Sequence, residues 1–398
     1  MLGSAELFTL NLLATFAPYI IVTISLNLEY GYCGVPNFGK TLAVAGGAFM
    51  AGVVPGRLLA GVLGVGQGLD YIDSNSMIVG QINTSLINNV PLSIEAFIIT
   101  LAAAAAFGAL LGFLIAYPVA RLRADYLGMT FLAAGQVILV IGNNYPPLVG
   151  GTLGVSVPDP FAFVTRFSAF GLLPGEMRMV TVIGVMSLVA FLIFLYARKL
   201  TNSPLGRMLR AVRDDEDSAL ALGKDVQRTR ITVIIFASAI AAIAGALYAF
   251  YTANVFATTY SRSSWTFWPW VMVILGGAAN NLGVVAGTFI FVAVRQTITF
   301  YKEAFAPFLP FDVVWVDTLL LGLALLIILV YRPEGLIREK PIRTIKTGAP
   351  PARVTFVEPG KTEPRGFMQR LKKAFQGLLN SLKRVLSKLK PRDSNKQT

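Results

Sequence analysis

Three arginines stand at intervals of three within residues 200–225, the longest charge-dense stretch between two apolar segments. On a short helix, Arg207, Arg210 and Arg213 would lie along one side while apolar residues fill the other. The stretch has the character of a docking surface, and nothing in it is typical of a catalytic site. An ordinary cytoplasmic loop, held to lipid headgroups by its arginines, is the alternative.

The flanking residues predict two short helices in this stretch. The first should run from Pro204 to Arg213, because proline is well tolerated in the first turn of a helix. Asp214 or Asp215 can cap the second, which should stop at Gly223, where a left-handed residue costs little. At about 1.5 Å per residue the first helix is about 15 Å long. It is too short to cross a bilayer but could fill a groove on a partner.

The composition predicts an all-α, polytopic transmembrane bundle. Of 398 residues, 55% are hydrophobic and 14% charged, and mean hydropathy is +0.65, which is far more apolar than a soluble domain requires. The chain has no histidine and a single cysteine, Cys33. The commonest general base and metal ligand is therefore missing and no internal disulfide can form, so an enzyme is not expected.

Apolar runs near 20 residues long locate the membrane elements. We expect spans at about 7–29, 38–60, 95–120, 125–143, 178–198, 229–253 and 313–331. A broken pair at about 266–300 adds an eighth element, or an eighth and a ninth.

The basic residues orient the spans. Arg121 and Arg123, the loop at 198–230 and the tail from Arg332 should face the cytoplasm, because cytoplasmic loops are enriched in Lys and Arg. The N-terminus is then outside and the C-terminus cytoplasmic, and segments 61–94 and 144–177 are external. The sequon at Asn83 agrees with this topology.

The net charge of +13 belongs almost entirely to the tail. From residue 332 onward there are 17 Lys/Arg and 5 Asp/Glu, so the basic pI does not predict nucleic-acid binding. Residues 339–366 should form a linker and 391–398 a short end. Residues 367–390 predict a basic amphipathic helix that lies on an anionic membrane surface, so membrane lipids are expected partners. Packing of this helix on a partner is the alternative.

Polar residues between the first two spans mark a candidate translocation path. Glu29 and Lys40 are costly near apolar runs, so they should be paired, at the interface or facing a wet cavity. A plain interfacial hairpin with snorkelling charges is the alternative. Asn27, Asn37 and Gly39 are the candidate path residues here, because glycine and polar side chains suit an unwound segment beside a path.

Further path candidates are Gln136, Gly276, Gly277 and Asn280. For Gln136 we favour a buried hydrogen bond between helices. The glycines and Asn280 interrupt a run too short to span, which predicts a re-entrant hairpin; a simple turn between helices is the alternative. The preceding tryptophans, at 265, 268 and 270, predict an aromatic belt at the outer interface.

Small residues predict two closely packed helices. The second span and its exit repeat glycine at 46, 47, 52, 56, 61 and 64, and residues 237–249 form an almost continuous face of alanine and glycine. Small side chains let helices approach closely in lipid, so both helices should lie inside the bundle.

Several ordered blocks over about residues 10–338 resemble the permeases of branched-chain amino acid ABC importers. They include S-P-L-G-R-M-L-R-A-V-R-D-D-E from Ser203, followed by A-L-A-L-G, and V-G-G-T-L-G-V from Val149. Where the family commonly has Ser-Leu-Gly-His, this chain has Asn-Phe-Gly-Lys, ending at Lys40. The permease domain is expected over 1–338, with a coupling segment at 200–225. The insertion at 66–89 carries no motif with an interpretable role.

The resemblance implies a transport subunit that works by alternating access. Its expected partners are two cytoplasmic ATP-binding subunits, a homologous permease and an extracellular substrate-binding protein. ATP and Mg²⁺ would be bound by the partners and no cofactor by this chain, which has no Walker motif. The implied substrate is a branched-chain amino acid, although relatives carry urea, amides or sugars. A secondary transporter or channel that works alone is the alternative.

The resemblance also assigns two sets of contacts. Residues of the coupling segment would meet the ATPase subunits: Pro204, Gly206, Arg207, Arg210, Arg213, Asp214 and Gly223. The loop of Gly150, Gly151 and Thr152 would lie on the side that receives the binding protein.

Overall fold

The computed structural model describes residues 3–119, 122, 124–166, 173–301, 319, 322–323, 326–327, 330–331 and 334–339. These fall into two units. The first contains the described residues up to 323 together with 334–339. In the second, residues 326–327 and 330–331 are helical. All of the predicted linker at 339–366 except residue 339, the predicted segments at 367–390 and 391–398, and most of the predicted span at 313–331 lie outside the described residues.

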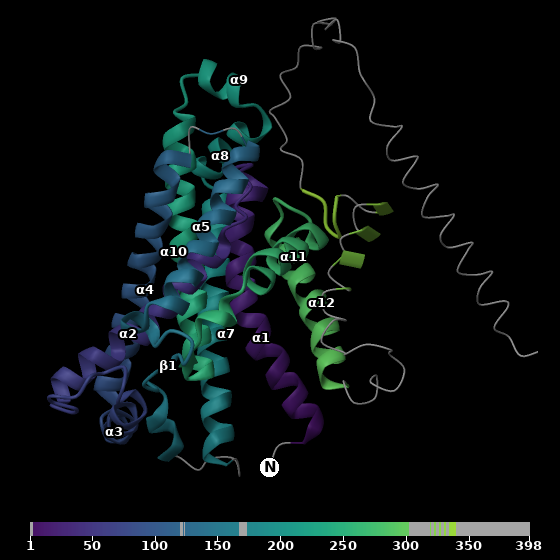
Figure 1. The fold of residues 1–398 in the computed structure, drawn as a ribbon. Helices are drawn as coiled ribbons and strands as arrows, with labels where there is room; N and C mark the ends of the chain where they lie inside the picture. Colours follow the sequence, from purple (N-terminus) through teal and green to yellow (C-terminus); the bar gives the residue numbers. More distant parts are fainter. Residues whose placement is uncertain are drawn as a thin grey trace, which may run out of the picture. The chain divides into compact units, whose positions relative to one another are not determined.

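The first unit is built almost entirely of helices (Figure 1). They are α1 (Ser4–Leu26), α2 (Lys40–Leu63), α3 (Asn75–Asn88), α4 (Val90–Val119), α5 (Ala124–Asn144), α6 (Pro146–Val149), α7 (Pro174–Thr201), α8 (Pro204–Asp214), α9 (Glu216–Ala221), α10 (Val226–Thr252), α11 (Trp268–Gly276) and α12 (Asn281–Phe300). The shorter elements are the π-helical η1 (Asn27–Tyr32) and η4 (Ser263–Phe267), the 3₁₀ turns η2 (Ala162–Arg166) and η3 (Ala257–Tyr260), and the antiparallel pair β1 (Val155–Ser156) and β2 (Asn254–Val255).

Seven helices of the described part are long and apolar enough to cross a membrane. They cover 5–32, 40–63, 90–118, 126–144, 174–201, 226–252 and 281–300. The first six confirm six of the predicted spans. The seventh, α12, is the second arm of the predicted broken pair, whose first arm, α11, has nine residues and is too short to span.

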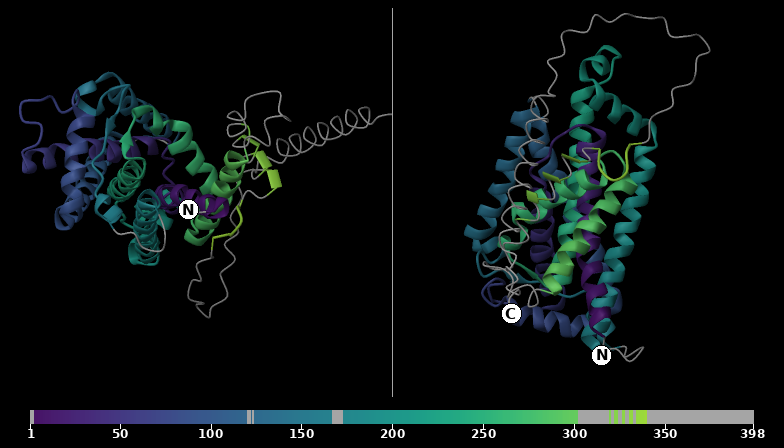
Figure 2. Two further views of the ribbon diagram at one scale, coloured as in Figure 1. Left: turned by 90° about the horizontal axis from the view of Figure 1, so that it is seen from below. Right: turned by 90° about the vertical axis from the view of Figure 1, so that its right-hand side faces the viewer.

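The two ends of the bundle carry different elements. Helices α8 and α9 lie at one end and α3 and β1 lie near the other (Figure 1); we call these the α8 end and the α3 end. Helix α1 lies beside α11 and α12 (Figure 2). The turn between the two arms of the broken pair therefore comes close to the last turns of α1.

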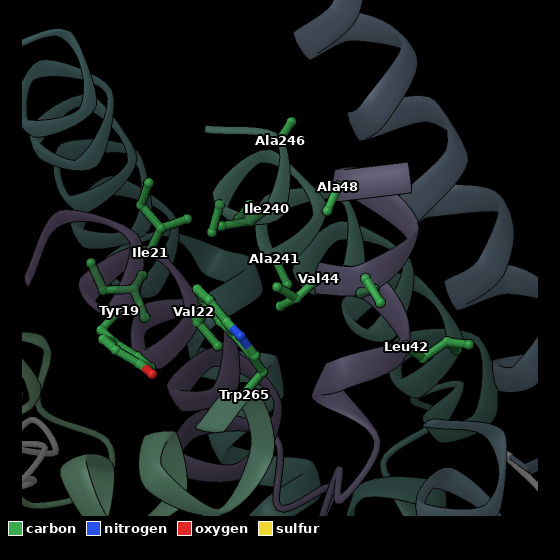
Figure 3. Packing of buried hydrophobic residues seen from close by; sticks show 14 of the residues in the cluster. Tyr19, Ile21, Val22, Leu42, Val44, Ala48, Ile240, Ala241, Ala246 and Trp265 are labelled. Carbon is green, nitrogen blue, oxygen red and sulfur yellow. The ribbon is translucent and has the colours of Figure 1, made fainter. Parts of the chain in front are cut away.

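The predicted packing of small residues is confirmed in the centre of the bundle. Helix α10 packs against α2 and α4. A Cβ added at Gly47 of α2 would lie 1.9 Å from the Ala242 carbonyl oxygen, and one at Gly245 of α10 would lie 1.9 Å from that of Val44. Figure 3 shows Val44 and Ala241 facing each other at this contact. Any side chain larger than hydrogen would push the two backbones apart.

The predicted aromatic belt is wrong. Trp265 is 2% exposed, and Trp268 and Trp270 are each 7% exposed. Trp265 stacks on Tyr19 with ring centroids 5.1 Å apart (Figure 3). The indole nitrogen of Trp270 donates to the Asn37 carbonyl oxygen at 3.0 Å. The tryptophans are buried because η4 and α11 re-enter the bundle, where they are surrounded by other helices.

The insertion at 66–89 has a structural role at the α3 end. It contains α3, whose Asn75 side chain accepts from the Ser156 amide of β1 at 2.7 Å. Asn83, the residue of the sequon, accepts from the Asp159 amide at 2.8 Å. Helix α3 is thereby joined to the loop that carries β1, and the side chain of Asn83 is already engaged by its own chain.

Candidate functional site

The last turn of the first span is held to the broken pair by Asn27. This side chain is fully buried. Its Nδ2 donates to Asn281 Oδ1 at 2.9 Å, and its Oδ1 accepts from the Ala279 amide at 2.8 Å. Gly31 must be glycine here, because an added Cβ would lie 2.1 Å from Asn27 Oδ1. The π-helical winding of η1 thus coincides with a contact between distant segments, as π-bulges often do at functional sites.

The turn of the broken pair, residues 277–280, is bonded to several other segments of the chain. Asn280 caps α12 by accepting from the Leu282 and Gly283 amides, and donates to the Arg338 carbonyl oxygen at 3.0 Å. Gly277 has φ +103°, which a side chain would strain. Residues 334–339 close the turn through two backbone bonds to α11, from Leu336 N to Leu275 O and from Ile337 N to Gly276 O. The irregular backbone therefore has partners within the chain, which non-helical backbone in a membrane requires.

Glu29 and Lys40 form an ion pair, which is one of the three arrangements expected for them. Lys40 Nζ lies 2.8 Å from Glu29 Oε2, and both side chains are fully buried. They do not snorkel to an interface. The Asn37 side chain lies beside the Glu29 carboxylate, and Thr41, next to Lys40, donates its amide to Thr266 Oγ1 at 3.1 Å. The connection between the first two spans is therefore braced by the first arm of the broken pair.

Helix α8 is attached to the end of α7 by Gly206 and Arg210. A Cβ at Gly206 would lie 2.1 Å from the Thr201 carbonyl oxygen, so the two backbones are in contact. Arg210 Nη2 donates to that same oxygen at 2.6 Å, and its guanidinium lies 5.6 Å from the centre of the Tyr32 ring of η1. Pro204 is the first residue of α8, as predicted.

Arg213 connects α8 to the first span. Its Nη1 donates to the Gly31 carbonyl oxygen at 2.7 Å, and its Nη2 lies 2.8 Å from Asp214 and 2.9 Å from Glu339. A Cβ at Gly34, which has φ +76°, would lie 3.1 Å from Arg213 Cγ. One side chain thus touches α8, η1 and the segment after the last span.

Their spacing led us to expect the three arginines on one face of α8. They do not share one face. Arg207 is exposed, whereas Arg210 and Arg213 turn inward to their own chain. At about 100° per residue, six residues separate Arg207 from Arg213 by about 120° around the helix. Arg207 is the most exposed of the three.

The second helix of this segment is capped by Asp215 rather than by Asp214. The Asp215 carboxylate accepts from the amides of Asp217 and Ser218, at 3.0 and 3.1 Å, and from the Ser218 hydroxyl. These bonds hold the pKa of Asp215 below its usual value. Gly223 has φ +73° just beyond α9, which agrees with its predicted place at the helix end.

Most of the predicted path residues gather at the α8 end. Asn27, Asn37, Gly276, Gly277 and Asn280 all lie in or against the broken pair. Their role in transport remains a prediction.

Gly39 and Gln136 differ from this group. Gly39 packs on α5, because an added Cβ would lie 2.2 Å from the Phe131 carbonyl oxygen. Gln136 is exposed on α5. The buried hydrogen bond that we favoured for it is therefore not formed within the described chain.

Two contributors to this site were missed from the sequence. Asn281 is buried and donates to Thr201 Oγ1 at 3.3 Å, so it joins α12 to both α1 and α7. Its position directly after Asn280, in an otherwise apolar segment, was a usable signal. The role of Thr266 carried no such signal, because a single threonine in a span commonly bonds to its own helix.

The predicted docking loop lies at the α3 end. Gly150 and Gly151 have φ of +71° and +59°, and Thr152 is exposed. A Cβ at Gly150 would lie 2.2 Å from the Gly154 carbonyl oxygen, so the loop is tightly closed. Val155 then pairs with Val255 in the β1–β2 ladder. The loop is thus fixed to the chain that leads into α11.

Comparisons with known proteins agree with this architecture. The family model described as branched-chain amino acid transport system / permease component matches residues 8–329. The chain is 39% identical over 343 residues to a probable branched-chain amino acid transport permease protein LivM of Methanocaldococcus jannaschii, covering 86% of this chain and 96% of the relative. No solved structure matches.

More distant relatives carry the same description. The high-affinity branched-chain amino acid transport system permease protein LivM of Escherichia coli is 25% identical over 367 residues, covering 87% of this chain and 73% of the relative. The Salmonella typhimurium protein of the same name is 25% identical over 366 residues, with the same coverage. Because the family model matches most of the length of this chain, this multi-pass membrane protein belongs to the permease component family of branched-chain amino acid transport systems.

Proposed function

We propose that the chain is the permease subunit of an ATP-driven importer in the cell membrane and forms the path for branched-chain or related amino acids. The family and the names of the relatives support this proposal. The observation that carries it is the pair of inward-facing arginines of α8, which bond the helix to the ends of α7 and α1. A helix held in this way can pass a displacement to the membrane spans.

In this proposal the α8 end faces the cytoplasm, the N-terminus is outside and the C-terminus is cytoplasmic. The basic residues of the α7–α10 connection support this orientation. Two ATP-binding subunits would contact α8 and α9 and hold ATP and Mg²⁺. A substrate-binding protein would dock on Gly150, Gly151 and Thr152 at the opposite end, and a homologous permease would complete the path.

Alternating access would begin at α8. Closure of the ATPase subunits would move the helix through its exposed side, where Arg207 lies. Arg213 would transmit the movement to Gly31 of η1, and Asn27 would transmit it to the turn at 277–280. Because packed cores are bistable rather than continuously deformable, such a shift would switch the path between its two sides.

The test is uptake by the complete complex in liposomes, scored together with ATPase assembly. We expect Arg207→Glu to reduce both ATPase co-purification and uptake, because the exposed charge is reversed at the contact. We expect Gly206→Leu to reduce uptake by about tenfold or more, because α8 would be forced away from Thr201. Arg228→Gln, which removes an exposed charge from α10, is the matched control. Normal assembly and uptake in Gly206→Leu would reject the coupling role.

Substrate and energy source have separate tests. Competition for uptake by leucine, urea, amides and sugars would identify which class the importer carries. Uptake by the purified chain alone, driven by an ion gradient and without ATP, would favour the alternative of a secondary transporter or channel.

A further inference from the structure

An apolar groove runs between α1, α7 and α12. Its cavity volume is about 350 Å³, and its lining includes Phe16 and Ile20 of α1, Phe191 and Phe194 of α7, and Val285 of α12. Among the described residues that line it, Ser187 has the one polar side chain. A zwitterionic amino acid would find no partner for its charges along this groove, so it does not suit the transported substrate.

A polar pocket lies at the α8 end of the same groove. Its cavity volume is about 170 Å³, and Phe194 and Leu282 line both spaces. Its polar lining includes Arg198 and Thr201 of α7, Arg210 of α8, Asn280 and Asn281 at the start of α12, and Glu339. The apolar groove and the polar pocket therefore form one amphipathic site.

The pocket has a surplus of positive charge. Arg198, in the last turn of α7, is exposed and lies within ion-pairing distance of none of the described carboxylates. Arg210 uses Nε and Nη2 in its bonds to Gly206 and Thr201, which leaves Nη1 available. The Glu339 carboxylate already engages Arg213. Two guanidinium groups can thus serve a ligand while the nearby acid is neutralised.

We propose that this site binds an anionic phospholipid from the leaflet at the α8 end. An acyl chain would fill the groove between α1, α7 and α12, and the phosphate would lie between Arg198 and Arg210. Arginine is well suited to phosphate oxygens, and basic pockets between membrane helices bind anionic headgroups. Because Arg210 belongs to α8, the bound lipid would stabilise the position of α8 on the end of α7.

The experiment measures lipid retained by the full-length chain. The protein is purified from nanodiscs of phosphatidylcholine with or without phosphatidylglycerol, and bound lipid is counted by native mass spectrometry. We expect selective retention of phosphatidylglycerol. Arg198→Gln should lower it by about fivefold, the loss expected for one basic residue near an anionic headgroup, and Arg198→Lys should restore most of it. Lys199→Gln, the neighbouring exposed charge, is the control.

A second pair of variants tests the groove. Ser187→Trp would fill it and should reduce retention, whereas Leu188→Trp, at an exposed position next to it, should not. An equal loss of bound phosphatidylglycerol in Arg198→Gln and Lys199→Gln would overturn the proposal. Retention of phosphatidylcholine equal to that of phosphatidylglycerol would also overturn it. Binding of glycerol phosphate in place of phosphatidylglycerol would also overturn it, because the ligand would then be a free phosphate and not a lipid. If Ser187→Trp leaves the amount of bound lipid unchanged but abolishes association with the second permease subunit, the groove is an interface for that subunit and the proposal is wrong.

Discussion

Arg213 Nη1 donates to the carbonyl oxygen of Gly31 across 2.7 Å, although 182 residues separate the two along the chain. The acceptor lies in the π-helical end of the first span, four residues after the asparagine that holds the broken pair. Helix α8 and the turn at 277–280 are thereby linked through one short segment. Each contact in this link can be removed separately.

Removing the Arg213 side-chain contacts should loosen α8 without unfolding the bundle. A charge-assisted hydrogen bond contributes about 1.5 to 3 kcal/mol. The Arg213 side chain is 23% exposed, so screening should reduce this to about 1 kcal/mol. Arg213→Gln should therefore raise hydrogen exchange of the α8 amides by about fivefold, measured by mass spectrometry. Arg228→Gln should leave them unchanged. Equal protection in both variants would show that Arg213 does not hold α8.

Breaking the buried ion pair should cost more than removing it entirely. Lys40→Met leaves the Glu29 carboxylate buried without its partner, which typically costs about 3 to 5 kcal/mol. The double variant Glu29→Gln with Lys40→Met should recover most of this loss, because no buried charge remains. Thermal unfolding in detergent measures the loss of stability in the single variant and in the double variant. Additive losses in the double variant would contradict a coupled pair.

The contact between α2 and α10 should not tolerate even one methyl group. Gly47→Ala places a Cβ 1.9 Å from the Ala242 carbonyl oxygen, so we expect a loss of about 1 to 3 kcal/mol from strain. Gly184 of α7 is the matched control, because nothing lies within 4 Å of its added Cβ. Gly184→Ala should raise stability by about 0.5 to 1 kcal/mol, since alanine favours helix. Thermal unfolding should show a lower Tm for Gly47→Ala and a higher Tm for Gly184→Ala.

Replacing Asn27 should release the turn at 277–280. Asn27→Leu removes the acceptor of the Ala279 amide and the donor to Asn281 Oδ1, and each buried unpaired group costs about 1 to 3 kcal/mol. Hydrogen exchange at residues 277–281 should rise, while α4 stays protected. Asn144→Leu is the control, because Asn144 is exposed and bonds only within its own helix. Unchanged exchange in Asn27→Leu would remove η1 from the proposed link.

The N-terminal end of α9 should become less stable in acid. The Ser218 hydroxyl and backbone amide lower the pKa of Asp215. The cap therefore contributes stability above the ordinary aspartate pKa of about 3.9, and this contribution is lost as pH falls through the lowered value. Hydrogen exchange of α9, corrected for intrinsic rates, should show the loss in that range. Ser218→Ala removes the largest cause and should move the loss to higher pH. A pH-independent protection of α9 would contradict this cap.

The spans and their packing could be predicted from the sequence because both depend on local composition. Twenty apolar residues are long enough to cross a bilayer, and small side chains allow close contact whichever helix supplies the partner. For Glu29 and Lys40, pairing could be predicted only as one of three arrangements, because the sequence does not show whether the two charges are buried together, lie at the interface or face a wet cavity.

The direction in which side chains point could not be predicted in the same way. Arg210 and Arg213 face inward only because Thr201 and Gly31 present carbonyl oxygens there, and these acceptors come from other helices. The burial of Trp265 depends on the re-entry of its segment, not on its apolar neighbours. Such contacts follow from tertiary arrangement, which helical periodicity alone does not contain.

The β1–β2 ladder has a thermodynamic consequence for the proposed importer. Val155 follows the loop of Gly150 and Gly151, and its partner Val255 begins the segment that runs into α11. The loop at 150–152 and the turn at 277–280 therefore lie on one connected stretch of structure. Linkage requires that two ligands coupled through it change each other's affinity by the same factor. The strength with which a binding protein holds the outer loop would then report, from outside the cell, whether ATPase subunits occupy α8.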